Sequence, residues 1–126
     1  MRQRCLTSIL TSGVPRRLRP GFWDNDGQCC GTAGVGAVFL DSWRRVGDER
    51  DLEFARHLAD TLVERAVVDG PHAYWRFVEH RAPEPLLPPG VGWNQGAAGI
   101  AAFLFRAARV TEQEPVRRMD NWWALP

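Results

Sequence analysis

Two stretches of the chain carry apolar residues on most helical faces, and a third carries them on one face only. Residues 33–46 and 97–110 lack proline and are mostly apolar, which predicts two buried helices. Residues 51–68 alternate charged residues with leucine, valine and alanine at helical spacing, which predicts an amphipathic helix. Asp48 precedes this helix as a candidate N-cap, and Gly47 ends the helix before it.

The remaining segments show weaker patterns. Residues 1–12 resemble a short amphipathic helix, and the aromatic and β-branched residues of 74–78 predict a short extended segment. Four prolines between residues 83 and 89 exclude a helix there, so residues 69–92 form a long connection. We expect the tail, residues 111–126, to be irregular and partly docked through its tryptophans.

One stretch of the sequence occurs twice. Residues 95–104 align with residues 30–39 at an offset of 65, and the matching positions include two glycines and two alanines. The chain therefore contains two copies of a glycine-rich turn followed by a buried helix, and such units usually stack on one another. Cys30 in the first copy corresponds to Gln95 in the second, so the thiol chemistry is not repeated.

Composition narrows the functional classes. The chain has 126 residues, enough for one domain, and its net charge of +1 gives no reason to expect a nucleic acid or an anionic membrane as partner. No apolar run is long enough to span a bilayer. Its three cysteines, two of them adjacent, do not form a disulfide framework. We therefore expect a reducing, cytoplasmic location.

Cys29 and Cys30 stand in the first glycine-rich turn, directly before a helix, where the free N–H groups favour thiolate over thiol. Three interpretations are open: metal ligation, with His80 or His72 as a further ligand; redox or nucleophilic chemistry; and simple packing in a tight turn. Nearby aspartates at positions 24 and 26 lack the spacing of a calcium loop and are expected to shape the turn.

The long connection contains a second group of chemically active residues. Glu79 and Arg81 are candidates for contacting a substrate, and His80 is a candidate proton donor because a histidine pKa can be tuned near neutrality. The alternative is a charged cluster that fixes an irregular loop.

The motifs Asn25–Gly36 and Gln95–Ile100 resemble the C-terminal part of the lanthionine synthetase C-like family, and the resemblance covers about residues 18–110. It implies an all-α fold: a partial α/α toroid of inner and outer helix pairs with a short extended or β segment between the repeats. In this interpretation residues 22–68 are the first repeat, 69–92 the connection and 93–110 the second repeat, followed by the tail.

The same resemblance implies a chemistry. Cys29 and Cys30 correspond to two zinc ligands of the family, whose cyclases use Zn²⁺ to activate a thiol for addition to a dehydroamino acid in a peptide. The product is a thioether ring, as in lanthipeptide biosynthesis. The implied substrate is a peptide or a small thiol. The family's third ligand, a cysteine in an upstream tryptophan-containing turn, has no counterpart here.

Because the family ring contains more repeats than this chain, we expect the chain to be a fragment that lacks an N-terminal half. It would then be inactive alone, and its uncovered helix faces would favour self-association. Two alternatives are a non-catalytic member that binds a peptide or protein and a non-functional truncated gene product.

Overall fold

The computed structural model describes residues 2–111. They form four helices, α1 (Arg2–Thr11), α2 (Thr32–Val46), α3 (Glu49–Arg65) and α4 (Ala97–Thr111). They also form four short strands, β1 (Val67–Asp69), β2 (His72–Tyr74), β3 (Phe77–Val78) and β4 (Leu86–Leu87). The expectation for the tail falls almost entirely outside the described residues.

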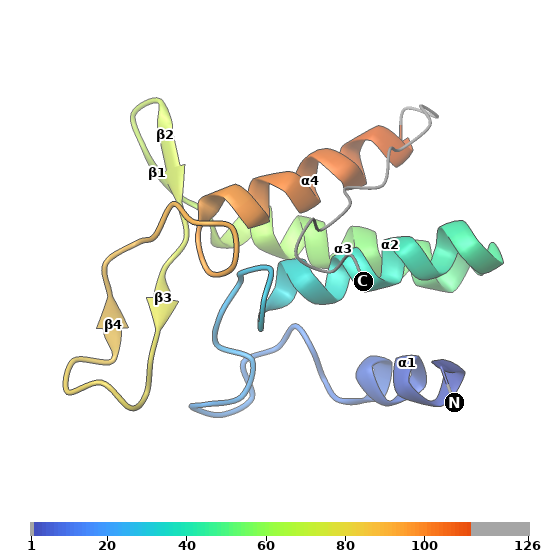
Figure 1. Cartoon of the computed structure of the whole chain (residues 1–126), viewed down its shortest axis with the longest axis horizontal. Coiled ribbons are helices and arrows are strands. Elements are labelled where there is room, and N and C mark those ends of the chain that lie inside the picture. The colour runs from blue at the N-terminus through green and yellow to red at the C-terminus, as the bar shows by residue number, and fades with distance from the viewer. Residues whose placement is uncertain (1, 112–126) are drawn as a thin grey trace, which may run out of the picture.

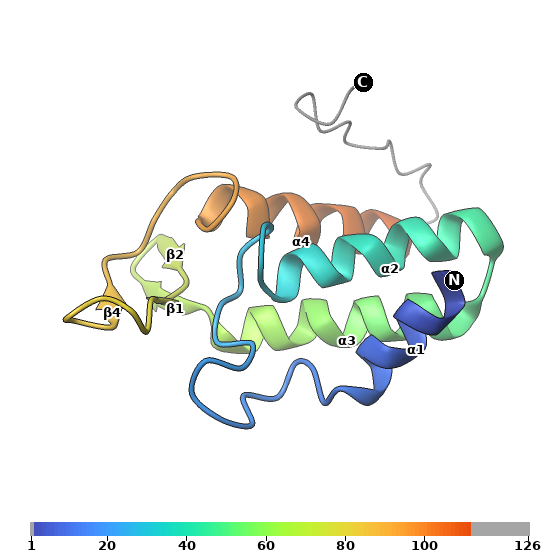
Figure 2. The ribbon, with the colours of Figure 1, turned by 60° about the horizontal axis from the view of Figure 1, so that its bottom comes forward.

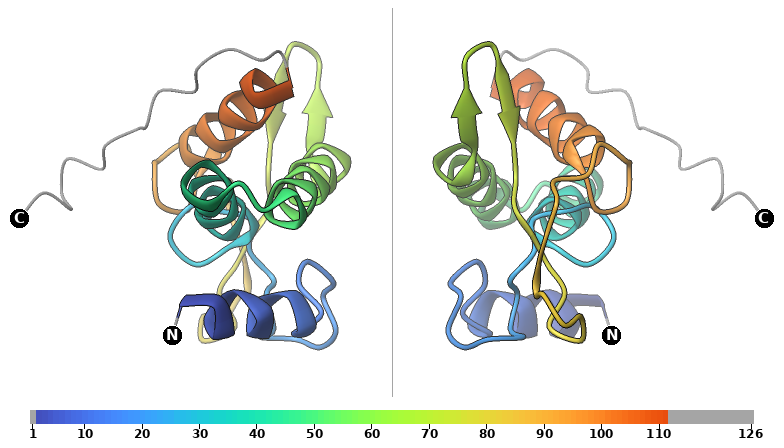
Figure 3. Two further views of the ribbon diagram at one scale, coloured as in Figure 1. Left: turned by 90° about the vertical axis from the view of Figure 1, so that its right-hand side faces the viewer. Right: turned by 90° about the vertical axis from the view of Figure 1, so that its left-hand side faces the viewer.

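Helices α2, α3 and α4 pack around one core, and α1 lies on the opposite side of the α2–α3 pair from α4 (Figures 1 and 3). The core contains Phe39 of α2, Leu58 of α3 and Phe103 of α4, which are at most 1% exposed. Burying an aromatic or leucine side chain contributes roughly 1.5–3 kcal/mol. Figure 2 shows that the strands and the two glycine-rich turns gather at one end of these helices. The core therefore holds the two turns at a common end.

The predicted helix boundaries are close to the observed ones. Gly47 ends α2 in the left-handed conformation, with φ of 74°, and Asp48 caps α3 by accepting a hydrogen bond from the backbone N–H of Arg50. Helix α3 ends at Arg65 rather than at residue 68. The difference arises because Val67 and Val68 pair with Tyr74 and Ala73 in an antiparallel ladder instead of continuing the helix.

The prediction of an all-α, partial α/α toroid is wrong. The described residues form four helices together with two antiparallel two-stranded sheets, β1–β2 and β3–β4, and they do not form a clear double ring of inner and outer pairs. The predicted extended segment at 74–78 includes the last residue of β2 and all of β3, but the sequence analysis missed β1 and β4. Prolines and glycines in 69–92 interrupt helical periodicity, so the apolar residues there pair as strands.

The two stretches that align at an offset of 65 begin their helices in the same way. Helices α2 and α4 both have 15 residues, and each begins at the same place in the repeat. The N–H of Thr32 donates to the carbonyl of Asn25 at 3.2 Å, and the N–H of Ala97 donates to the carbonyl of Gly90 at 3.0 Å. These two bonds are equivalent at the offset of 65. Each copy therefore has a helix of the same length, and in both copies the turn joins the helix through an equivalent hydrogen bond.

Among residues 2–111, no helix combines the length and the apolar character needed to cross a lipid bilayer.

Candidate functional site

The two glycine-rich turns lie against each other. The N–H of Cys29 donates to the carbonyl of Asn94 at 2.8 Å. Gly27 allows this contact, because a Cβ built on it would lie 2.6 Å from the carbonyl oxygen of Asn94. The first turn therefore presents its thiols beside the second turn, which carries Gln95.

Glycines inside both helices hold the turns close. A Cβ on Gly34 would lie 2.1 Å from the carbonyl oxygen of Gln28, and a Cβ on Gly99 would lie 1.9 Å from that of Trp93. Both distances are too short for a side chain, so each turn folds back onto the first turn of its helix. The shared glycine motif is explained by this close approach rather than by a ligand.

Asp26 holds the first turn in place through hydrogen bonds to other parts of the chain. It is 3% exposed and accepts hydrogen bonds from Arg17 at 3.0 Å, Arg65 at 2.8 Å and the hydroxyl of Thr32 at 2.9 Å. A buried carboxylate with this many donors is satisfied as an anion. The expectation that Asp26 shapes the turn agrees with these contacts, which use its oxygens for protein donors.

Cys29 and Cys30 are both exposed and unoxidised. Cys30 lies close enough to the thiol of Cys29 and to the side chain of Gln95 for both to affect its pKa through hydrogen bonding. Partial burial at the turn raises the pKa of Cys30 above its usual range, and the neighbouring Cys29 and the carboxylate of Glu79 raise it further. The Gln95 hydrogen bond opposes this rise in pKa. The two thiols thus form an interacting pair.

The candidate residues of the connection lie at two different places, one near Cys30 and one at Asp24. Glu79 lies close enough to Cys30 to raise its pKa, and its carboxylate also accepts the backbone N–H of Arg81 at 3.0 Å. His80 contacts Asp24 through Nε2, which also accepts the N–H of Gly21 at 2.9 Å. This contact is the main cause that lowers the pKa of Asp24. His72 is exposed in β2.

The thiol pair fits a soft metal ion in donor type, because exposed cysteines can deprotonate to thiolates. It does not supply a full ligand set. Within residues 2–111, no three His, Cys, Asp or Glu side chains are grouped so that they could hold a metal ion. Neither His80 nor His72 therefore joins the two cysteines in such a group. Any further ligand has to come from a substrate, from solvent or from elsewhere.

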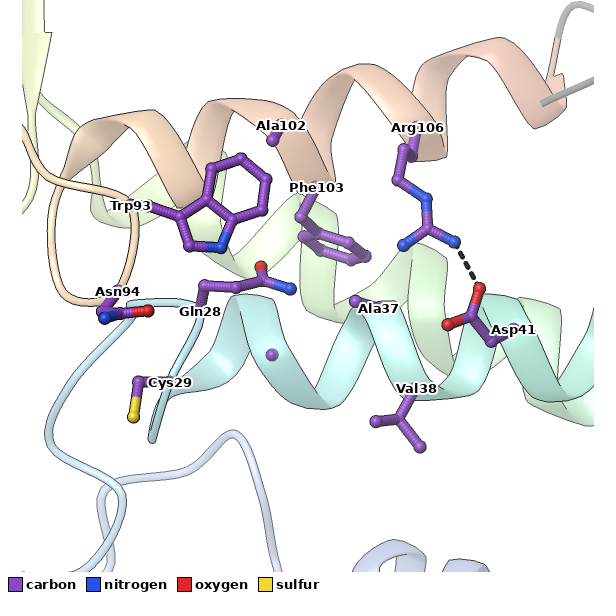
Figure 4. A pocket seen from close by; sticks show the side chains of 11 residues that line it. Gln28, Cys29, Ala37, Val38, Asp41, Trp93, Asn94, Ala102, Phe103 and Arg106 are labelled. Carbon is purple, nitrogen blue, oxygen red and sulfur yellow. Dashed lines mark hydrogen bonds and ion pairs between the residues drawn. The ribbon is translucent and has the colours of Figure 1, made fainter. Parts of the chain in front are cut away.

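A cavity of about 290 Å³ lies beside the thiols, between α2 and α4 (Figure 4). Cys29 stands at one end of it, and Asp41 and Arg106 stand at the other, joined by an ion pair of 2.5 Å. Sequence reasoning missed the contributions of Trp93 and Arg106. The repeat offered a signal for Arg106, since it corresponds to Asp41 at the offset of 65.

No protein-family model matches the chain, and no curated protein or solved structure is similar enough to it to count as a match.

Proposed function

We propose that Cys29 and Cys30 form the protein half of a zinc site that prepares a thiol for addition to a dehydroamino acid in a peptide. The observation that carries this proposal is the contact between the two exposed thiols, each presented by the same helix-entry turn. The likeness of this turn and of its repeat to the lanthionine synthetase C-like family points in the same direction. Such a reaction forms a thioether between the two partners.

The chain's own residues would have limited roles. Cys29 and Cys30 would bind the ion as thiolates, and Gln95 would orient Cys30 through its hydrogen bond. When bound, Zn²⁺ stabilises a substrate thiol as thiolate near neutral pH. Glu79 and Arg81 lie on the connection and would contact the peptide, and of the two Glu79 is near enough to affect Cys30. His80 stays the candidate proton donor, although Asp24 and Gly21 now occupy its Nε2.

The first experiment measures zinc in the purified chain. We expect up to one equivalent of zinc per chain, and we expect its loss in Cys29→Ser and in Cys30→Ser. Cys5→Ser is the matched control, since Cys5 is also exposed but lies on α1. Zinc that persists in both turn variants, or a chain that takes up none when zinc is supplied, would contradict the proposal.

The second experiment tests the reaction with a dehydrated peptide that carries a cysteine. We expect no thioether product from the isolated chain, because the pair supplies only two ligands. Turnover by the isolated chain would show that this expectation is wrong. We further propose that the chain acts in the cytoplasm, where both thiols stay reduced.

A second candidate function is non-catalytic binding of a peptide or protein. It is favoured by the face of α4 that bears Phe105, whose surface is 71% exposed. Exposed aromatic side chains of this kind are frequent at binding surfaces. A chain that binds no zinc but associates with itself or with a partner through this face would support this candidate.

A further inference from the structure

The cavity between α2 and α4 contains two buried polar atoms without a partner. Among the described residues, nothing hydrogen-bonds to Gln28 Oε1 or to Arg106 Nε, and both side chains line the cavity. A buried polar atom without a hydrogen-bond partner is unfavourable. A ligand that hydrogen-bonds to both atoms would therefore be favoured in this cavity.

The charges of the cavity select a neutral ligand. Arg106 is 9% exposed, and its Nη2 donates to Asp41 Oδ1 at 2.5 Å, so the guanidinium charge is already balanced. An anion bound there would also face the carboxylate of Asp41. A neutral group with one N–H donor and one carbonyl acceptor suits Gln28 Oε1 and the guanidinium together.

The walls and the size narrow the ligand further. Phe103, Ala37 and Ala102 form apolar walls, and the indole of Trp93 lies over Gln28 (Figure 4). Gly36 allows the ring of Phe103 to pack directly on α2, since a Cβ there would lie 2.1 Å from the ring. A volume of about 290 Å³ is at the low end for ligand pockets and suits one amino-acid residue rather than a cofactor.

We propose that this cavity binds one peptide unit of an extended or unfolded peptide, namely its amide group and one apolar side chain. The amide N–H donates to Gln28 Oε1, the amide carbonyl accepts from the Arg106 guanidinium, and the side chain contacts Phe103 and Trp93. The site does not depend on zinc. Because Cys29 lines the same cavity, a peptide bound here lies beside Cys29.

The test is a titration of the ¹⁵N-labelled chain with N-acetyl-leucine N-methylamide, followed by NMR through the Trp93 indole and Gln28 side-chain signals. We expect saturable shifts at both positions at millimolar probe. Gln28→Met removes the acceptor while keeping the shape, and it should weaken binding about tenfold. Arg109→Lys, an exposed change on α4, the helix that carries Arg106, should leave binding unchanged.

Two further arms make the outcome decisive. The double variant Cys29→Ser/Cys30→Ser should bind the probe as the unaltered chain does, which separates this site from the zinc proposal. N-acetyl-leucine with a free carboxylate should bind more weakly than the methylamide. The proposal is overturned if the probe causes no shifts, if Gln28→Met binds equally well in a folded chain, or if the carboxylate binds more tightly.

Discussion

The first turn–helix unit, residues 25–46, and the second, residues 90–111, have the same backbone but different surroundings. Helix α3 covers α2, so Leu40 is fully buried. Its counterpart at the offset of 65 is Phe105, which is 71% exposed on α4. The two copies also differ in side-chain chemistry, since Cys30 carries a thiol and its counterpart Gln95 carries an amide.

The comparison shows which features the two copies have in common and which differ between them. Both units keep the glycines that let a turn fold onto its helix, and both keep the bonds from the turn carbonyls to the first helical N–H groups. Side chains that meet a neighbour, or that project from the turn, differ between the copies. Repetition therefore fixes the backbone, while neighbours and single substitutions decide burial and chemistry.

The largest expected effect tests the difference in burial. Leu40→Ala should destabilise the chain by about 2–5 kcal/mol, because it leaves a cavity in the core. Phe105→Ala should change the free energy of unfolding by less than about 0.5 kcal/mol, because the side chain is mainly in solvent. Urea unfolding of both variants measures these values.

An equal loss in the two variants would mean that Phe105 is covered in solution. Sedimentation at several concentrations would then identify the cause. We propose self-association through the α4 face as the covering contact, so Phe105→Glu should lower the association constant of any dimer. A chain that is monomeric at all concentrations and still loses stability in Phe105→Ala would contradict this explanation.

The next effect tests whether the glycines serve the same purpose in both copies. Gly34→Ala and Gly99→Ala should each destabilise the chain by about 1–3 kcal/mol, because the new methyl group would meet a backbone carbonyl. Gly92→Ala is the matched control in the second turn, since its Cβ would have no neighbour within 4 Å. Thermal unfolding distinguishes the three, and a stable Gly99→Ala would end the proposed equivalence.

Local patterns in the sequence predicted the main helices but not the short sheets or the way in which the helices are arranged. Apolar periodicity located α2, α3 and α4, and the matching glycines located the repeat, because both are local properties. Strands β1 and β4 were missed because each has only two or three residues, too few to show an alternating pattern. Those sheets, together with the arrangement of the helices, contradict the expected all-α toroid.

The candidate site was predictable to a similar extent. The adjacent cysteines could be chosen from the sequence, since their position before a helix and their type are local. The contact of Gln95 with Cys30, and the pairing of Arg106 with Asp41, depend on how α2 and α4 pack. A sequence pattern does not specify which turn residues meet across two helices, so the cavity beside Cys29 was missed.

The next prediction concerns a variant in which the second turn carries a cysteine at the position that corresponds to Cys30. Gln95 hydrogen-bonds to Cys30, so Gln95→Cys would place a third thiol beside the pair and complete a common zinc ligand set. We expect the zinc dissociation constant to fall at least about tenfold, measured by competition with a chromogenic chelator. Val91→Cys adds a thiol elsewhere in the same turn and should have no such effect. Equal affinities in the two variants would argue against a metal site at Cys30.

The smallest effect concerns protonation within the first turn. The neighbouring Cys29 raises the pKa of Cys30, whereas the Gln95 hydrogen bond lowers it. Cys29→Ala should therefore lower the pKa of Cys30 and increase its rate of alkylation by iodoacetamide near pH 8, because the thiolate is the reacting form. Gln95→Ala should raise that pKa and slow the reaction at the same pH.

Mass spectrometry of the Cys30 peptide over a range of pH values gives both pKa shifts directly, and Cys5 in the same sample is an internal control for reagent activity. Opposite shifts in the two variants require Cys30 to contact both turns in solution. Shifts in the same direction would mean that one of the two contacts is absent, and the variant whose shift has the unexpected sign would identify it. Since the zinc proposal needs Cys30 directed toward Cys29, failure of the Cys29→Ala shift would count against that proposal more strongly than failure of the Gln95→Ala shift.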